Sequence, residues 1–119
     1  MVGEAKARGV GTFVQASAER LPFPDGRFDL AMSTFSFHHW ADQPAALREV
    51  GRVLAPGGAL AVSDAFPLGV WRVLRVFRHG RMRTPEEMRA LLAAAGFRRF
   101  RRIPVASMRG VVAVLLATR

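Results

Sequence analysis

The chain has 119 residues, of which half are apolar and 23% are charged, a composition typical of one folded domain and not of a disordered segment. It contains no cysteine, which excludes a disulfide framework, a cysteine zinc site and thiol catalysis. Its 18 basic and 9 acidic residues give a net charge of +9. The stretches without charged residues are too short to span a bilayer, and no secretory signal is visible, so we expect a cytoplasmic protein.

The positive charge is concentrated in the second part of the chain. Residues 70–119 contain twelve arginines and two acids, whereas residues 1–69 contain six basic and seven acidic residues. A segment this basic attracts phosphates, anionic lipid or an acidic partner. Charge alone therefore predicts contact with anions but does not identify them.

The first half of the chain predicts, in order, a helix, two strands and a second helix. Residues 1–8 are typical of the end of a helix that Gly9 terminates, and residues 12–16 are a short run of β-prone residues. A loop with two prolines and an Asp-Gly turn leads to an apolar run of strand length at residues 28–35. Over residues 44–54, apolar residues recur at three- and four-residue spacing, which predicts a helix with one buried face.

The second half predicts a strand, a helix and two closing strands. Residues 59–63 form an apolar run of strand length after the Pro-Gly-Gly sequence that ends the preceding helix. Thr84 is a typical N-cap for a helix that Gly96 ends. Residues 100–106 and 111–117 predict two strands, and their short connection requires them to be antiparallel.

This order of elements predicts an α/β fold: a mostly parallel sheet with helices on both faces and an antiparallel strand pair at the carboxyl end. We expect a single domain over residues 1–119. Ligands of such sheets bind beyond the carboxyl ends of the strands. Those ends carry small and hydroxyl-bearing side chains at residues 16–19, 33–36 and 63–66. These side chains either reach a flat polar ligand or cap the turns that follow.

Three sequence motifs occur in a defined order along the chain. They are ASAERLPFPDGRFDL followed by SFHHW (residues 16–40), LREVGRVLAPGGAL (residues 47–60), and TPEE leading to AGF (residues 84–97). Together they resemble class I S-adenosylmethionine-dependent methyltransferases, and more closely the subgroup that contains the ubiquinone/menaquinone biosynthesis C-methyltransferases. The resemblance covers nearly the whole chain. It implies a Rossmann-like fold, S-adenosylmethionine as cofactor and methyl transfer to a small-molecule acceptor.

The family domain also has a glycine-rich loop after its first strand and an acidic residue at the end of its second. Gly9 and Gly11 do not fit that loop, because they follow a predicted helix and precede a predicted strand. We therefore expect the chain to match the latter two-thirds of a methyltransferase, without the first βαβ portion. Such a chain should bind the cofactor weakly or not at all, and its exposed sheet edge should favour self-association.

The resemblance assigns three residues to cofactor binding. Ser17 and Ala18 occupy the positions that face the adenine, where a side-chain acceptor takes the amino group and the next backbone N–H meets a ring nitrogen. The family usually has Asp or Asn where this chain has Ser17, so that contact should be shorter and weaker. Thr34 occupies the position near the methionine part of the cofactor. The alternative role of all three residues is in turns.

No residue is assigned a catalytic role from the sequence. We expect Asp25 in a turn and Asp29 in a structural role at the start of a strand, whereas Asp64 either contacts substrate or caps a helix or is solvated. For His38 and His39 we expect a packing or rim role, because a base is needed only where the attacking atom loses a proton. Their side chains should diverge by about 100° on a helix. No metal site is expected.

Residues 66–83 follow the ligand-side end of a strand, where they would cover a substrate. The segment is amphipathic if helical and carries Arg72, Arg75 and Arg78 at every third position. It is therefore a substrate lid, a contact with an anionic membrane surface, or a surface helix with solvated arginines. No nucleic-acid partner is expected, because no recognition motif accompanies the charge. The alternative function is a non-catalytic remnant that acts as a basic module for anions, a membrane surface or a protein.

Overall fold

The computed structural model describes residues 11–34, 36–65, 83–104 and 112–119. In chain order, its elements are β1 (Phe28–Thr34), the 3-10 helix η1 (Phe37–His39), α2 (Gln43–Val53), β2 (Leu54–Ala65), α4 (Pro85–Ala94), β3 (Arg98–Pro104) and β4 (Val112–Thr118). The helix expected at residues 1–8 and nearly all of the expected lid segment, up to residue 82, lie outside the described residues.

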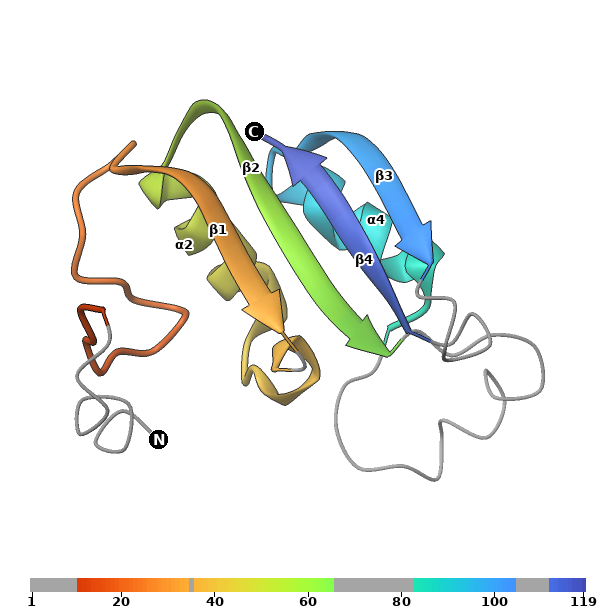
Figure 1. Ribbon diagram of the computed structural model, residues 1–119, viewed down its shortest axis with the longest axis horizontal. Helices are drawn as coiled ribbons and strands as arrows, with labels where there is room; N and C mark the ends of the chain where they lie inside the picture. Colours follow the sequence, from red (N-terminus) through yellow and green to blue (C-terminus); the bar gives the residue numbers. More distant parts are fainter. Residues whose placement is uncertain (1–10, 35, 66–82, 105–111) are drawn as a thin grey trace.

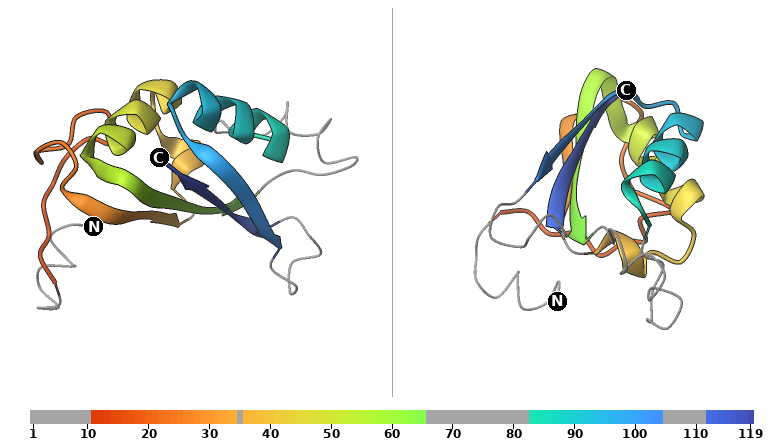
Figure 2. Two further views of the ribbon diagram at one scale, coloured as in Figure 1. Left: turned by 90° about the horizontal axis from the view of Figure 1, so that it is seen from above. Right: turned by 90° about the vertical axis from the view of Figure 1, so that its right-hand side faces the viewer.

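The four strands form one sheet in the order β1-β2-β4-β3 (Figure 1). β1 pairs with β2 in parallel, whereas β4 pairs with both β2 and β3 in antiparallel directions. The antiparallel arrangement of the last two strands confirms the expectation from their short connection. The α/β fold class is likewise confirmed, with the parallel pairing of the described strands confined to β1 and β2. The two α-helices, α2 and α4, lie on one face of the sheet (Figure 2), so the expected helices on both faces are not found among the described residues.

The strand expected at residues 12–16 is wrong. These residues have no regular secondary structure, and an isolated bridge between Ser17 and Arg20 follows them. β-prone side chains form a strand only where a neighbouring strand supplies hydrogen-bond partners. None of the four described strands pairs with this segment, so its local propensity has no partner to act on.

β2 begins five residues earlier than expected, because the Pro-Gly-Gly sequence lies inside the strand as an irregularity. Four residues of β2, 55–58, stand where β1 has one. Gly57 has a φ of +80°, a left-handed conformation that glycine adopts without steric penalty. A Cβ atom on Gly58 would lie 2.8 Å from the carbonyl oxygen of Ala55. The sequence correctly indicated a break here, but the break interrupts a strand and does not precede it.

The two α-helices, α2 and α4, each begin at a side-chain cap. Thr84 Oγ1 accepts the backbone N–H of Glu87 at 3.2 Å, which confirms the predicted N-cap of α4, and Gly96 follows this helix with a φ of +95°. The cap of α2 was not predicted: the carboxylate of Asp42 accepts the backbone N–H of Ala45 at 3.1 Å. Each cap satisfies one N–H that the first turn of a helix leaves without a partner.

The core lies between the two helices and the face of the sheet that they cover. Its fully buried apolar side chains come from both layers: Leu47 of α2, Leu54, Leu60 and Val62 of β2, and Met88 and Leu92 of α4. Burying a side chain of this size stabilises the fold by about 1.5–3 kcal/mol. On β1, Leu30 and Met32 are 54% and 72% exposed. The described residues therefore cover one face of the sheet much more completely than the other.

Leu47→Ala should lower the free energy of unfolding by about 2–5 kcal/mol, because it removes a fully buried side chain and leaves a cavity. Leu30→Ala makes the same chemical change at an exposed position and should change the free energy by about 0.5 kcal/mol or less. Urea unfolding followed by circular dichroism measures both values. Equal losses in the two variants would contradict the core described above.

Candidate functional site

The parallel pairing of β1 with β2 brings the carboxyl ends of both strands to one edge of the sheet. Thr34, the last residue of β1, is the register partner of Ser63 near the end of β2. Figure 1 shows both arrowheads pointing to the same side of the molecule, with η1 beside the tip of β1. We call this edge the carboxyl rim and define it by residues 33–34, 36–39 and 63–64.

A buried carboxylate on β2 fixes the first histidine of the rim. Asp64 is 2% exposed, and its Oδ1 and Oδ2 atoms lie 2.9 and 3.0 Å from Nδ1 of His38. Oδ2 also accepts the backbone N–H of His38 at 3.2 Å. The histidine side chain remains 20% exposed. A neutral imidazole that donates from Nδ1 to a carboxylate has an unprotonated Nε2, which is then a proton acceptor.

This pair corrects two expectations. Asp64 is not solvated, because its side chain is buried, although a capping role is right in part, since it accepts an N–H of the short helix η1. His38 lies at the rim as expected. The two histidine side chains do not diverge: the ring centroids of His38 and His39 lie 3.9 Å apart. The signal that could have found the pair is topological, since neighbouring parallel strands end at the same edge.

Further side chains hold η1 in place. Ser33 Oγ lies 2.9 Å from Ser36 Oγ, so the end of β1 is tied to the residue that precedes η1. The buried Gln43 donates from Nε2 to the carbonyl oxygen of Phe37 at 3.2 Å, and its Oε1 accepts from Nε of Arg83 at 2.7 Å. Phe37 itself is buried in the core. The backbone that carries the two histidines is therefore held by a strand, by α2 and by the residues that precede α4.

The residues expected to face the adenine lie in a tight turn before β1. The carbonyl oxygen of Ser17 accepts the N–H of Arg20 at 3.1 Å, and Ser17 Oγ accepts the N–H of Glu19 at 3.3 Å. Glu19 in turn accepts the N–H of Asp42 at 2.8 Å, immediately before α2. The turn therefore lies beside the N-terminal end of α2. In the described part of the chain, no hydrogen bond joins this turn to Thr34, which is exposed at the tip of β1.

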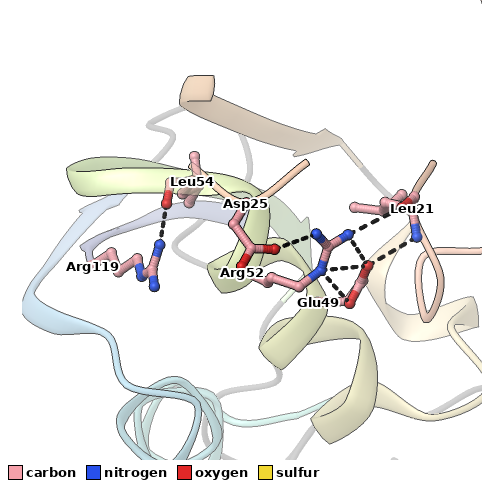
Figure 3. A network of polar contacts seen from close by, with 6 residues as sticks. All are labelled: Leu21, Asp25, Glu49, Arg52, Leu54 and Arg119. Carbon is pink, nitrogen blue, oxygen red and sulfur yellow. Dashed lines mark hydrogen bonds and ion pairs between the residues drawn. The ribbon is translucent and has the colours of Figure 1, made fainter. Parts of the chain in front are cut away.

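An ion-pair network fastens the segment before β1 along α2 (Figure 3). Arg52 donates through Nε to both carboxylate oxygens of Glu49 at 3.0 and 3.1 Å, and through Nη1 to Asp25 at 2.6 Å. Nη2 of Arg52 reaches the carbonyl oxygen of Leu21 at 3.1 Å, and Glu49 accepts the N–H of Leu21 at the same distance. Asp25 lies in the expected turn and also accepts a hydrogen bond from Arg52. Asp29 is exposed near the start of β1, and its structural role stays a prediction.

The network changes the protonation behaviour of its members. The hydrogen bond from Arg52, followed by the backbone hydrogen bond from Leu21, lowers the pKa of the Glu49 carboxyl from its ordinary value of 4.5. The same contact with Glu49 raises the pKa of the Arg52 guanidinium. A carboxyl whose pKa is lower in the folded chain stabilises the fold above its ordinary pKa, and this contribution is lost as the pH falls through the folded value.

Glu49→Gln should therefore lower the free energy of unfolding at pH 7 and should flatten its decline as the pH falls below about 4.5. The glutamine keeps the shape of the side chain but has no charge to lose. Asp29→Asn is the matched control, because it removes an exposed carboxylate outside the network. Urea unfolding between pH 7 and pH 3 measures both effects. The same pH dependence in Glu49→Gln and the unmodified chain would contradict the role given to this network.

The fold matches that of solved S-adenosylmethionine-dependent methyltransferases. A solved structure from Thermotoga maritima, described as such an enzyme and as a possible histamine N-methyltransferase, matches 99% of this chain and 68% of its own, with a TM-score of 0.83 and 24% identity. A solved S-adenosylmethionine-dependent methyltransferase from Mesorhizobium loti matches all of this chain and 76% of its own, with a TM-score of 0.76 and 20% identity. The [4+2]-cyclase SpnF also matches, with a TM-score of 0.74 and 22% identity over 98% of this chain and 60% of its own. At these identities the likeness shows the fold, which also occurs in a protein named for another reaction.

A family model described as a methyltransferase domain matches residues 1–62, and the chain belongs to that family. The demethylmenaquinone methyltransferase of Thermus thermophilus is 40% identical over 79% of this chain and 56% of its own length. A ubiquinone/menaquinone biosynthesis C-methyltransferase of Shewanella baltica is 47% identical over 53% of this chain and 27% of its own length. The resemblance drawn from the three motifs is confirmed. The chain spans about half or less of the length of these curated relatives.

S-adenosylmethionine is the cofactor that this family and fold imply. Within the described ranges, no three His, Asp or Glu side chains are grouped so that they could hold a metal ion. None of the helices in those ranges is long and apolar enough to cross a membrane.

Proposed function

We propose that this chain binds S-adenosylmethionine at the carboxyl rim and directs its methyl group to a small-molecule acceptor. The observation that carries the proposal is that Thr34 and the His38–Asp64 pair lie where parallel strands end, which is where open α/β sheets bind ligands. When bound, the cofactor supplies an electrophilic methyl group on a sulfonium. The contribution of the protein is then mainly to hold that group and the acceptor in line.

The hydrogen-bonding groups of the Ser17 turn fit the edge of an adenine ring. Ser17 Oγ accepts one N–H, from Glu19, and a hydroxyl oxygen has a second lone pair for the adenine amino group. Within the described residues the Ala18 N–H has no hydrogen-bond acceptor, so it is available to a ring nitrogen. A single neutral hydrogen bond contributes about 0.5–1.5 kcal/mol. We therefore assign Ser17 and Ala18 to the adenine, with weak affinity.

Thr34 is the third residue that we assign to the cofactor. It is the last residue of β1 and is exposed, and its register partner Ser63 lies on the adjacent parallel strand. The hydroxyl of Thr34 is thus accessible at the rim, where it can serve the methionine part of the cofactor.

S-adenosylhomocysteine, the demethylated product, should raise the midpoint of thermal unfolding of this chain. At a concentration one hundred times Kd, binding to the folded state alone adds about 2.7 kcal/mol. Ser17→Ala and Thr34→Val should each weaken binding by about two- to tenfold, the value of one hydrogen bond. Thr12→Val, which removes an exposed hydroxyl that we do not assign to the site, is the control. A cooperative transition that does not move with ligand would contradict cofactor binding by this chain.

A second function, a non-catalytic basic module, is supported by strand β3. Arg98 and Arg101 are exposed on this strand, and a cavity of about 250 Å³ lies beside it, lined in part by Arg89 of α4, Phe100 and Arg101. Clustered guanidinium groups attract anions. Arg72, Arg75 and Arg78, on which this alternative first rested, lie outside the described residues.

If β3 is such a module, the chain should sediment with vesicles that contain phosphatidylglycerol but not with vesicles of phosphatidylcholine alone. The double variant Arg98→Glu, Arg101→Glu should lose that binding, since it reverses two charges on one strand. Arg27→Glu, Arg48→Glu makes the same change in net charge elsewhere and should retain most of it. Equal loss in the two double variants would show that net charge, and not β3, is responsible.

A further inference from the structure

We propose that two copies of this chain pair through the outer edge of β1, strand against strand and antiparallel, so that two four-stranded sheets join into one sheet of eight strands. The pairing is centred on Ala31, so that every residue of β1, from Phe28 to Thr34, lies opposite a residue of the second copy. This assigns a strand, a direction and a partner to the self-association expected from the sequence, and it does not depend on the function proposed above.

The two outer strands of the sheet differ in how their edges are protected. β3 contains four arginines and ends at Pro104, and an irregularity interrupts its pairing with β4 between Arg98 and Arg101. Charged side chains, proline and β-bulges are features by which natural proteins prevent an edge strand from pairing with another chain. β1 has a single charged residue, Asp29, and no proline, and its register with β2 is continuous from Leu30 onwards. Because no described strand pairs with its outer edge (Figure 1), the sheet has one protected edge and one that can accept a strand.

The side chains of β1 fit those of a second copy. Leu30 and Met32 are 54% and 72% exposed, and they lie on the face opposite the helices, since the intervening Ala31 is the register partner of the core residue Leu60. In a pair centred on Ala31, Leu30 of each copy lies opposite Met32 of the other. Residues directly opposite each other point to the same face, with their Cβ atoms about 4.5–5.5 Å apart. Two contacts between large apolar side chains therefore form. A register shifted by one residue would separate Leu30 from Met32 and place the helices of the two copies on opposite faces.

Charge does not oppose this pairing, although the chain has a net charge of +9. Asp29 lies opposite Ser33 of the second copy, so no like charges meet across the two strands. The arginine-rich β3 strands lie at the two ends of the joined sheet, seven strand spacings or about 34 Å apart. At physiological ionic strength, charges are screened beyond about 8 Å. Pairing through β3 would instead place the arginines of both copies side by side. The assembly therefore closes at two copies.

Sedimentation equilibrium of the full chain tests the association. Over about a hundredfold range of concentration, the mass should rise from that of one chain to that of two, as mass action requires. Met32→Lys should weaken the dimer by about tenfold or more, because it sets a charge against Leu30 of the other copy. Ile103→Lys is the matched control: it makes the same change in charge at a residue of β3 that is 44% exposed, and it should leave the association unchanged. Circular dichroism should show both variants folded, since both side chains are exposed.

Disulfide formation tests the register. The chain has no cysteine, so introduced thiols are its only ones. When equal amounts of the variants Leu30→Cys and Met32→Cys are mixed and oxidised, the two cysteines lie directly opposite each other only in the mixed dimer. In dimers of one variant, the cysteines are diagonal neighbours about 7–8 Å apart, beyond the reach of about 6.8 Å between the Cα atoms of a disulfide. Mass spectrometry should therefore find well over half of the cross-linked product as the mixed dimer, whereas random pairing gives half.

Each part of the proposal has a result that would overturn it. A chain that keeps the mass of one copy at every concentration would exclude the association, and masses above that of two copies would exclude the closed dimer. Equal weakening by Met32→Lys and Ile103→Lys would show that net charge, and not β1, controls it. A mixed disulfide at or below half of the product would exclude the antiparallel register centred on Ala31. Where Met32→Lys does not fold, the disulfide experiment alone decides.

Discussion

The parallel pairing of β1 with β2 is the constraint on which the carboxyl rim depends. Because both strands run in the same direction, the residues that follow β1 and the last residues of β2 meet at one edge, and His38 reaches Asp64 across 26 positions of sequence. Register matters as much as direction. Asp64 has the same parity along β2 as the buried Val62, so a shift of one residue would turn it to the other face of the sheet. The position of one histidine is thus set by the hydrogen bonds of two strands.

The two ends of α2 contact different parts of the segment that precedes β1. At its start, Asp42 caps the helix and its own N–H is accepted by Glu19, so the turn that holds Ser17 lies near the helix N-terminus. At its other end, Arg52 and Glu49 bind the loop that leads into β1. The contact of Glu19 with Asp42 lies beside the turn that we assign to the adenine, whereas the contacts of Arg52 and Glu49 lie at the other end of the helix. Together they fasten a segment without regular secondary structure along the length of one helix.

The sequence alone predicted those structural features that depend on residues close to one another along the chain. Thr84 before Pro85 and two acids predicted the cap of α4, and the apolar spacing of residues 44–54 predicted the buried face of α2. The cap at Asp42 is equally local and could have been read from the proline that follows it. Residues 12–16 show the limit of such local reasoning. Their side chains favour a strand, but none of the described strands pairs with them, so no strand forms.

The candidate site was less predictable, for a physical reason. The Ser17 turn and Thr34 came from a family resemblance, and their roles stay predictions. The contact of His38 with Asp64 depends on which strands are neighbours, in which direction they run and which face each residue takes. The neighbours and directions of the strands follow from the expected parallel sheet, and they would have placed His38 and Asp64 at one edge. The third depends on the exact register, which the irregularity at residues 55–58 displaces.

The order of the strands in space differs from their order in the chain. β4 follows β3 in sequence but lies between β2 and β3, and the residue after it, Arg119, donates its N–H to the carbonyl oxygen of Gly58 at 2.9 Å. During synthesis, β3 and α4 therefore emerge before the strand that joins them to β1 and β2. β4 can take its place between β2 and β3 only after both of these strands have been synthesised. His38 and Asp64 both precede α4, β3 and β4 in the chain. β4, which pairs with the strand that carries Asp64, is the last of the described strands to be synthesised.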